Sequence, residues 1–79
     1  MVYLVECRDG SIYCGATNNI IKRIKVHNAG KGSKYTKSRL PVTLLLTSRM
    51  MSKSEALRLE HKVKKQKAIA KVNYLKQIT

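Results

Sequence analysis

The sequence predicts an α+β fold in which a small antiparallel sheet packs against helices, in the order ββαβαα. Three observations predict this class. The first residues are β-rich and carry a hairpin turn signal, later segments repeat apolar residues at helical spacing, and helix-capping residues stand before two of these segments. With 79 residues the chain has room for one domain, which we expect to span residues 1–79.

The first two strands are predicted as a hairpin. Residues 1–7 and 11–15 are the strand-like runs, and Asp9-Gly10 between them is a strong turn signal. A three-residue loop over 8–10 would put Gly10 in the left-handed conformation of a β-bulge, which glycine adopts readily.

The length of this loop decides which side chains share a face. With a two-residue turn, Tyr3 and Tyr13 would lie on opposite faces of the sheet. With the three-residue loop they share a face, and Gly15 lies opposite Tyr3, where it leaves space for a ring or a ligand. We favour the three-residue loop because it also gathers an apolar set on the other face. That set is Val2, Leu4, Ile12 and Cys14.

A first helix is predicted over residues 20–29. Asn18 and Asn19 are good N-caps, and Gly30 is a natural stop just beyond the last turn. Its apolar arc contains Ile20, Ile21, Ile24 and Asn28.

The rest of the chain is predicted as a basic loop, a strand and two helices. Residues 30–39 form the loop, and the β-branched and leucine-rich run 42–47 is expected to be a central strand. A capping box over 52–55 opens a helix that should run to about Lys65, and a last helix covers roughly 68–77.

Charge is the strongest compositional signal. Seventeen Lys and Arg against four Asp and Glu give a net charge of +13 and a pI near 10.2. Such a charge favours a polyanionic partner, and nucleic acid is the common one. No apolar run is long enough to span a membrane and the first residues do not resemble a secretion signal. We therefore expect an intracellular, cytoplasmic protein with no membrane partner.

The two cysteines do not predict a disulfide or a metal site. Cys7 and Cys14 lie in apolar strand-like runs, and their spacing fits no metal-binding motif. We expect both to be small buried hydrophobic residues.

Three polar residues on the predicted helices are candidates for chemistry. Arg23 and His27 are four residues apart at the edge of the first helix's apolar arc, where we expect them to be partly buried. For Arg23 a simple phosphate contact or a solvated position is an alternative, and for His27 a role at the helix C-terminus. Glu60 falls inside the apolar stripe of a later helix, which is costly unless it meets a cation or a metal. Lys64 or Arg23 could supply the cation, and one Mg²⁺ or Mn²⁺ ion could supply the metal.

These residues together resemble the GIY-YIG nuclease family, in its small stand-alone branch. The first motif appears as Met1-Val2-Tyr3 and the second as Tyr13-Cys14-Gly15, and both are followed by Arg23, His27 and Glu60 in order. The resemblance implies a three-stranded antiparallel sheet flanked by helices, with the active site on one face of the sheet.

The resemblance also implies roles for the site residues. Tyr3 would be the general base, directly or through a relay, and Tyr13 would position the water or the scissile phosphate. Arg23 would stabilise charge on the phosphoryl oxygens, and His27 would assist proton transfer or hold the phosphate. Glu60 would hold the divalent ion. The resemblance thus implies a metal-dependent endonuclease acting on DNA rather than RNA, in repair, recombination or DNA uptake.

The basic loop is expected to contact the nucleic acid. Its candidate contacts are Lys31, Lys34, Tyr35, Lys37 and Arg39, with Lys64 from the later helix. Tyr35 could stack on a base or anchor the loop on the core. Because the chain has no separate recognition domain, contacts should be to the phosphate backbone, and a protein partner could supply specificity. The alternatives to an endonuclease are a non-catalytic binding module with the same fold and an RNA- or ribosome-associated protein.

Overall fold

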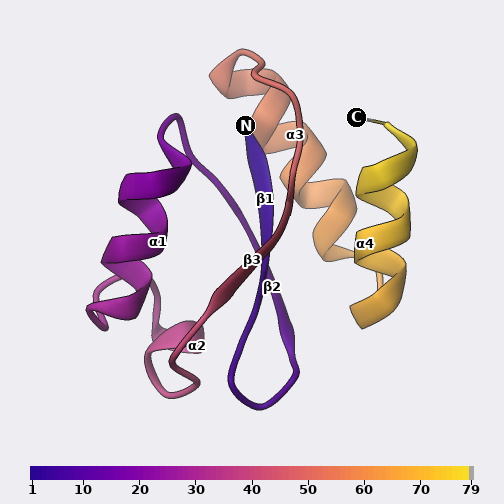
Figure 1. Cartoon of the computed structure of the whole chain (residues 1–79). Helices are drawn as coiled ribbons and strands as arrows, with labels where there is room; N and C mark the ends of the chain where they lie inside the picture. Colours follow the sequence, from indigo (N-terminus) through magenta and orange to yellow (C-terminus); the bar gives the residue numbers. More distant parts are fainter. Residues whose placement is uncertain (79) are drawn as a thin grey trace.

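The computed structural model describes residues 1–78; Thr79, the last residue of the expected domain, lies outside them. Three strands form one antiparallel sheet in the order β2-β1-β3. Helices α1 and α2 lie on one side of this sheet, and α3 and α4 lie on the other (Figure 1). The predicted fold class and element order are confirmed, with one short helix added.

The hairpin has the register that the three-residue loop predicts. β1 (Val2–Glu6) pairs with β2 (Ile12–Ala16) so that Tyr3 faces Gly15. Gly10 has φ 85°, the left-handed conformation expected of it. The two tyrosines of the motifs therefore share a face of the sheet.

The prediction that residues 42–47 form a central strand was wrong. β3 (Thr43–Thr47) is an edge strand, and β1 is in the centre. The burial of the strands reflects this order, because Val2–Val5 are fully buried whereas Leu44 and Leu45 are each 41% exposed. A run of leucines predicts a strand, but the number of its neighbours depends on how the sheet assembles.

The first helix has the predicted caps. α1 (Ile20–Asn28) begins at Asn19, whose side chain accepts a hydrogen bond from the Lys22 backbone N–H. Gly30 (φ 80°) follows the C-cap Ala29, and the backbone N–H groups of Gly30 and Lys31 bond back to the last turn. These two bonds form a Schellman motif, which reverses the chain toward the sheet.

The segment predicted as a basic loop contains a short helix, α2 (Lys34–Lys37). Ser33 caps it, with its hydroxyl accepting from the Thr36 backbone N–H at 3.1 Å. A single helical turn gives little periodic signal in the sequence, so the basic composition dominated the prediction.

The C-terminal part forms two longer helices. α3 (Lys53–Lys64) opens with the predicted capping box of Ser52 and Glu55, and α4 (Ala68–Gln77) follows it. They cover one face of the sheet and build a core with the even-numbered side chains of β1. That core contains Val2, Leu4, Cys14, Ala56, Val63 and Leu75.

A second, smaller core lies on the other face of the sheet. It contains Tyr3, Val5, Cys7 and Val42, with Ile20 and Ile24 of α1 packed against it. The alternation of β1 thus sends its even residues to one core and its odd residues to the other. The face with the odd residues is the one that carries both motif tyrosines.

Candidate active site

Tyr3 lies against Gly15 of the neighbouring strand. A Cβ atom at Gly15 would overlap the Tyr3 hydroxyl and lie 2.5 Å from Tyr3 Cζ. Only glycine leaves space for the ring at this position, as the hairpin register predicts. The second motif therefore fixes the place of the first motif's tyrosine.

The Tyr3 hydroxyl joins two side chains of α1. It lies 2.7 Å from His27 Nε2, and it accepts a hydrogen bond from Arg23 Nε at 3.2 Å. Arg23 is fixed a second time, because its Nη2 donates to the backbone carbonyl of Gly32 at 3.0 Å. Residues separated by twenty positions or more are thus brought into one hydrogen-bonded cluster.

His27 is buried more deeply than its position at the edge of the helical arc predicts. It has no exposed surface, and its Nδ1 lies 2.9 Å from the Thr36 hydroxyl of α2. The cause is the segment 30–39, which folds back over α1 and seals the ring from solvent. Burial lowers the pKa of His27, and the positive charge of Arg23 lowers it further. The imidazole is therefore neutral at pH 7.

Tyr3 also has no exposed surface. Burial raises the pKa of its phenol, and the hydrogen bond and charge of Arg23 offset this only in part. The phenol is therefore protonated at neutral pH, and its polar contacts are with Arg23 and His27.

Tyr13 lies between the buried cluster and the surface. Its half-buried ring meets the His27 ring edge-on, with centroids 5.5 Å apart, and stacks with Tyr35 at 5.8 Å. The Arg39 guanidinium lies 3.9 Å from the centroid of the Tyr35 ring and forms an ion pair with Asp9 at 3.0 Å. Tyr35 thus packs between Tyr13 and Arg39, where its two predicted roles, anchoring the basic segment and stacking on a base, both remain predictions.

Glu60 is on α3, the helix that covers the other face of the sheet. Its side chain is only 16% exposed, and Oε1 lies 3.8 Å from Lys64 Nζ. Lys64 Nζ in turn lies 5.9 Å from the centroid of the Tyr13 ring, so this pair reaches the outer edge of β2. Among residues 1–78, Glu60 forms no direct polar contact with Tyr3, Arg23 or His27.

The remaining basic candidates are exposed on the same side as the cluster. Lys31, Lys34 and Lys37 flank or belong to α2, and no ion pair involves them within the described part of the chain. Arg39 and Lys64, in contrast, already have carboxylate partners. The structure thus divides the predicted nucleic-acid contacts into three free lysines and two paired cations.

Two residues of the cluster were missed from sequence. Thr36 is fully buried against His27, and Gly32 accepts from Arg23 while a Cβ there would overlap His27 Nδ1. The signal for Thr36 was the serine three residues before it, which is the spacing of an N-cap and its partner. Nothing in the sequence pattern separates Gly32 from an ordinary loop glycine.

The cysteines are free and buried, as predicted. Burial raises the pKa of Cys14 to about 12, so its thiol stays protonated at neutral pH. No group of three or more His, Cys, Asp or Glu residues comes together within residues 1–78. In the same residues, every helix is too short or too polar to cross a membrane.

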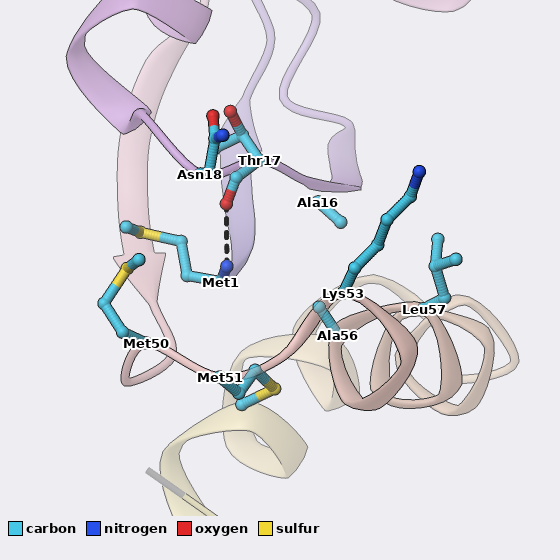
Figure 2. A pocket seen from close by; sticks show the side chains of 9 residues that line it. All are labelled: Met1, Ala16, Thr17, Asn18, Met50, Met51, Lys53, Ala56 and Leu57. Carbon is cyan, nitrogen blue, oxygen red and sulfur yellow. Dashed lines mark hydrogen bonds between the residues drawn. The ribbon is translucent and has the colours of Figure 1, made fainter.

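A pocket lies away from this cluster. A cavity of about 330 Å³ opens where β1 begins and α3 starts, and the three methionines of the chain line it. Figure 2 shows these methionines on one side and Lys53 and Leu57 on the other. Tyr3, Arg23 and His27 of the cluster do not line this cavity, nor does the neighbouring Tyr13. The cluster is a buried hydrogen-bonded group that reaches the surface through the partly exposed Arg23 and Tyr13.

Comparison with known proteins identifies the family. The model of the GIY-YIG catalytic domain matches residues 1–73. A UPF0213 protein of Streptococcus agalactiae, SAG0778, is 46% identical over 76 residues, which is 96% of this chain and 86% of that protein. UPF0213 protein SH2523 of Staphylococcus haemolyticus is 54% identical over 63 residues, which is 80% of this chain and 77% of that protein.

A solved structure agrees with these matches. The solution NMR structure of UPF0213 protein BH0048 from Bacillus halodurans is 43% identical and superposes with a TM-score of 0.57. The match covers 96% of this chain and 81% of that one. From its two tyrosine motifs, its fold and these relatives, the chain belongs to the GIY-YIG family, in the UPF0213 group.

Proposed function

We propose that this protein is a metal-dependent endonuclease that hydrolyses DNA phosphodiester bonds with little sequence preference, in DNA repair or recombination. Membership of the GIY-YIG family supports a nuclease-type activity. The observation that carries the proposal is the cluster in which Tyr3 joins Arg23 to His27 beside the half-exposed Tyr13.

Arg23 is the group best suited to the phosphate. Its Nε and Nη2 are held by Tyr3 and Gly32, whereas no described residue bonds its Nη1. A guanidinium fixed along one edge is preorganised to donate to phosphoryl oxygens along another. Stabilisation of the charge that develops on those oxygens is the largest contribution such a group can make.

Tyr3 and Tyr13 have different roles in this proposal. Because Tyr3 is sealed from solvent, it acts through Arg23 and His27 and does not contact the attacking water in this arrangement. Tyr13 keeps exposed surface, so its phenol positions the water or the scissile phosphate. His27, which is neutral, holds the Tyr3 hydroxyl at 2.7 Å and so helps to orient Arg23.

Glu60 suits a single divalent ion. Its side chain is mostly buried, and its ion pair joins Oε1 to Lys64 Nζ at 3.8 Å, so Oε2 remains available as a ligand. A site with one carboxylate fits Mg²⁺ or Mn²⁺, which keep several waters and share phosphate oxygens. When bound, the ion would neutralise charge on the leaving oxygen.

The alternative is a non-catalytic nucleic-acid-binding module with the same fold. The observation that favours it is the position of Glu60, on the helix opposite the cluster and paired with Lys64. Binding alone would need the lysines but neither Glu60 nor a divalent ion.

Plasmid nicking separates the two functions. Purified protein is incubated with supercoiled plasmid and Mg²⁺ or Mn²⁺, and with EDTA as the metal-free control. We expect nicking by wild type, and a loss of at least about a hundredfold for Arg23→Ala and for Glu60→Gln. Lys25→Ala, on the exposed side of α1, and Glu6→Gln, at the end of β1, make similar charge changes and should nick like wild type.

A gel-shift assay of the same variants completes the test. If all proteins shift DNA equally and none nicks it, the binding module is the correct function. If Arg23→Ala or Glu60→Gln nicks at the wild-type rate, the observed activity comes from a contaminating nuclease and the proposal is wrong.

A further inference from the structure

We infer that Thr36 is a positioning residue that locks one tautomer of His27 and, through it, the orientation of Tyr3 and Arg23. The inference begins with the hydrogen-bond donors around the Tyr3 hydroxyl. Arg23 has no acceptor atom, so its Nε can only donate to Tyr3. The proton of the Tyr3 hydroxyl must therefore go to another group.

His27 is the group that receives this proton. Tyr3 is fully buried, and among the described residues its polar contacts are with Arg23 and His27. The Tyr3 hydroxyl thus donates to His27 Nε2 across 2.7 Å. A neutral imidazole that accepts at Nε2 carries its proton on Nδ1.

Thr36 accepts the Nδ1 proton. Its hydroxyl lies 2.9 Å from His27 Nδ1 and is completely buried, so water does not compete for this bond. Its own proton has two acceptors on Ser33, the hydroxyl oxygen at 2.9 Å and the backbone carbonyl at 3.4 Å. The donors therefore run in one direction, from Tyr3 through His27 and Thr36 to Ser33, and each buried group is satisfied.

The opposite direction leaves a buried donor without a partner. If His27 carried its proton on Nε2, it would donate to Tyr3 as Arg23 does, and the Tyr3 proton would have no acceptor among the described residues. An unsatisfied buried donor is costly. The Tyr3 and Arg23 donors therefore select the Nδ1–H tautomer, and Thr36 supplies the acceptor that this tautomer needs.

This orientation matters for the phosphate-binding edge of Arg23. A Tyr3 hydroxyl that donates to His27 turns a lone pair toward Arg23 Nε, which holds the guanidinium with Nη1 free. This part of the inference rests on the proposed nuclease function, whereas the tautomer of His27 does not.

NMR spectroscopy of protein with ¹⁵N-labelled histidine tests the tautomer directly. The chain contains two histidines, and His61 is exposed, so it serves as an internal reference. At pH 7.5 we expect His27 to show Nδ1 as the protonated nitrogen in wild type and in Thr36→Ser. In Thr36→Val, which keeps the shape but not the hydroxyl, we expect the Nε2–H form to be populated.

The same three proteins are compared by plasmid nicking. We expect Thr36→Val to lower the nicking rate by about tenfold to a hundredfold and Thr36→Ser to restore it, with unchanged plasmid binding. Wild-type His27 protonated on Nε2, or Thr36→Val with an unchanged tautomer and rate, would overturn the inference. If His27 has the locked tautomer but the protein never nicks DNA, the role of Thr36 in the tautomer is supported. The effect on the phosphate-binding edge of Arg23 and the proposed nuclease function are then both refuted.

Discussion

Single glycines set the geometry of the cluster. Gly15 and Gly32 have ordinary backbone angles, yet a Cβ at either position would overlap a buried ring, Tyr3 in one case and His27 in the other. They are needed for space, whereas Gly10 is needed for its positive φ. Within the hairpin, alanine at Gly15 therefore tests the need for space, and alanine at Gly10 tests the need for a positive φ.

Gly15→Ala is expected to disturb the site. Overpacking should destabilise the protein by about 1–3 kcal/mol, and displacement of Tyr3 should lower the nicking rate by about a hundredfold. Gly10→Ala is the control, because its Cβ meets nothing within 4 Å. Its strained backbone should cost about 1–2 kcal/mol without changing the rate of the folded protein. Urea unfolding and plasmid nicking measure the two quantities, and equal nicking by the two variants would contradict the steric argument.

The buried His27 should make stability depend on pH. Its pKa is lowered in the folded state, so only the unfolded chain takes up a proton as pH falls below about 6.5. Stability is then complete above pH 6.5 and falls below it, by up to about 1.4 kcal/mol per pH unit. The pKa values of the Asp9 and Glu55 carboxyls are lowered in the folded state, so these groups titrate at more acidic pH than His27.

Urea unfolding at pH 7.5, 6.5 and 5.5 measures this dependence. His27→Leu removes the titrating group and should flatten the pH profile between 6.5 and 5.5, even though the variant is less stable overall. An identical slope in wild type and His27→Leu would show that another group is responsible.

At the scale of residues, the sequence predicted which side chains lie together better than it predicted how deeply each is buried. The spacing of the motifs identified Tyr3, Arg23 and His27, which the structure joins by hydrogen bonds. It did not predict that His27 would be fully buried, because burial depends on a segment folding back from positions 32–36. Ile21, which the helical arc placed among apolar residues, is 70% exposed, although its spacing matches that of its apolar neighbours. Periodicity finds a face, but only tertiary packing decides what covers it.

At the scale of elements, Asn28 links the first helix to the last strand. Its side-chain Oδ1 accepts from the Val42 backbone N–H at 2.8 Å, and its Nδ2 donates to the Val42 carbonyl at 3.3 Å. The side chain replaces a strand partner for a residue that directly precedes β3. It therefore fixes the distance between α1 and the sheet, on which the His27 contact with Tyr3 depends.

Asn28→Ala is expected to destabilise the protein by about 1–3 kcal/mol, because it leaves the partly buried Val42 N–H unsatisfied. Asn18→Ala, at an exposed position just before the helix, should change stability by less than about 0.5 kcal/mol. Urea unfolding of both variants at pH 7.5 makes the comparison. Equal stabilities would show that the Asn28 bonds do not couple the two elements.

Local signals predicted the elements well, and long-range features escaped them. Asn19, Gly30 and the Ser52–Glu55 box mark helix ends that the structure confirms, since a cap is a property of neighbouring residues. The edge position of β3 depends on a crossover through α1 and α2, which no local pattern reports. The helix α2 was not predicted because a single turn is too short to show a helical period.

At the scale of the whole molecule, the charge of +13 is distributed over both sides of the sheet. If the cluster is the place where DNA binds, the exposed lysines beside it should dominate binding. Those are Lys31, Lys34 and Lys37. Lysines of the opposite side, at positions 67, 71 and 76, provide a set with the same total charge.

We expect replacement of the first set by glutamine to reduce the slope of log K against log [salt] by up to about three, since each phosphate contact contributes about 0.9. Replacement of the second set should reduce the slope by less than about one. Fluorescence anisotropy with a short DNA duplex at several salt concentrations measures both slopes. Equal reductions would indicate that DNA binds to the whole surface without preference for the cluster.

The two-sided packing of β1 has a consequence for how this strand tolerates change. Within a segment of five residues, the odd positions pack in the core that holds Tyr3, and Val2 and Leu4 pack in the core beneath the two C-terminal helices. A library of single substitutions along this segment should therefore yield two interleaved phenotypes. Changes at Val2 and Leu4 would lower the amount of folded protein without altering its rate, whereas changes at Tyr3 and Val5 would alter the rate of whatever protein folds.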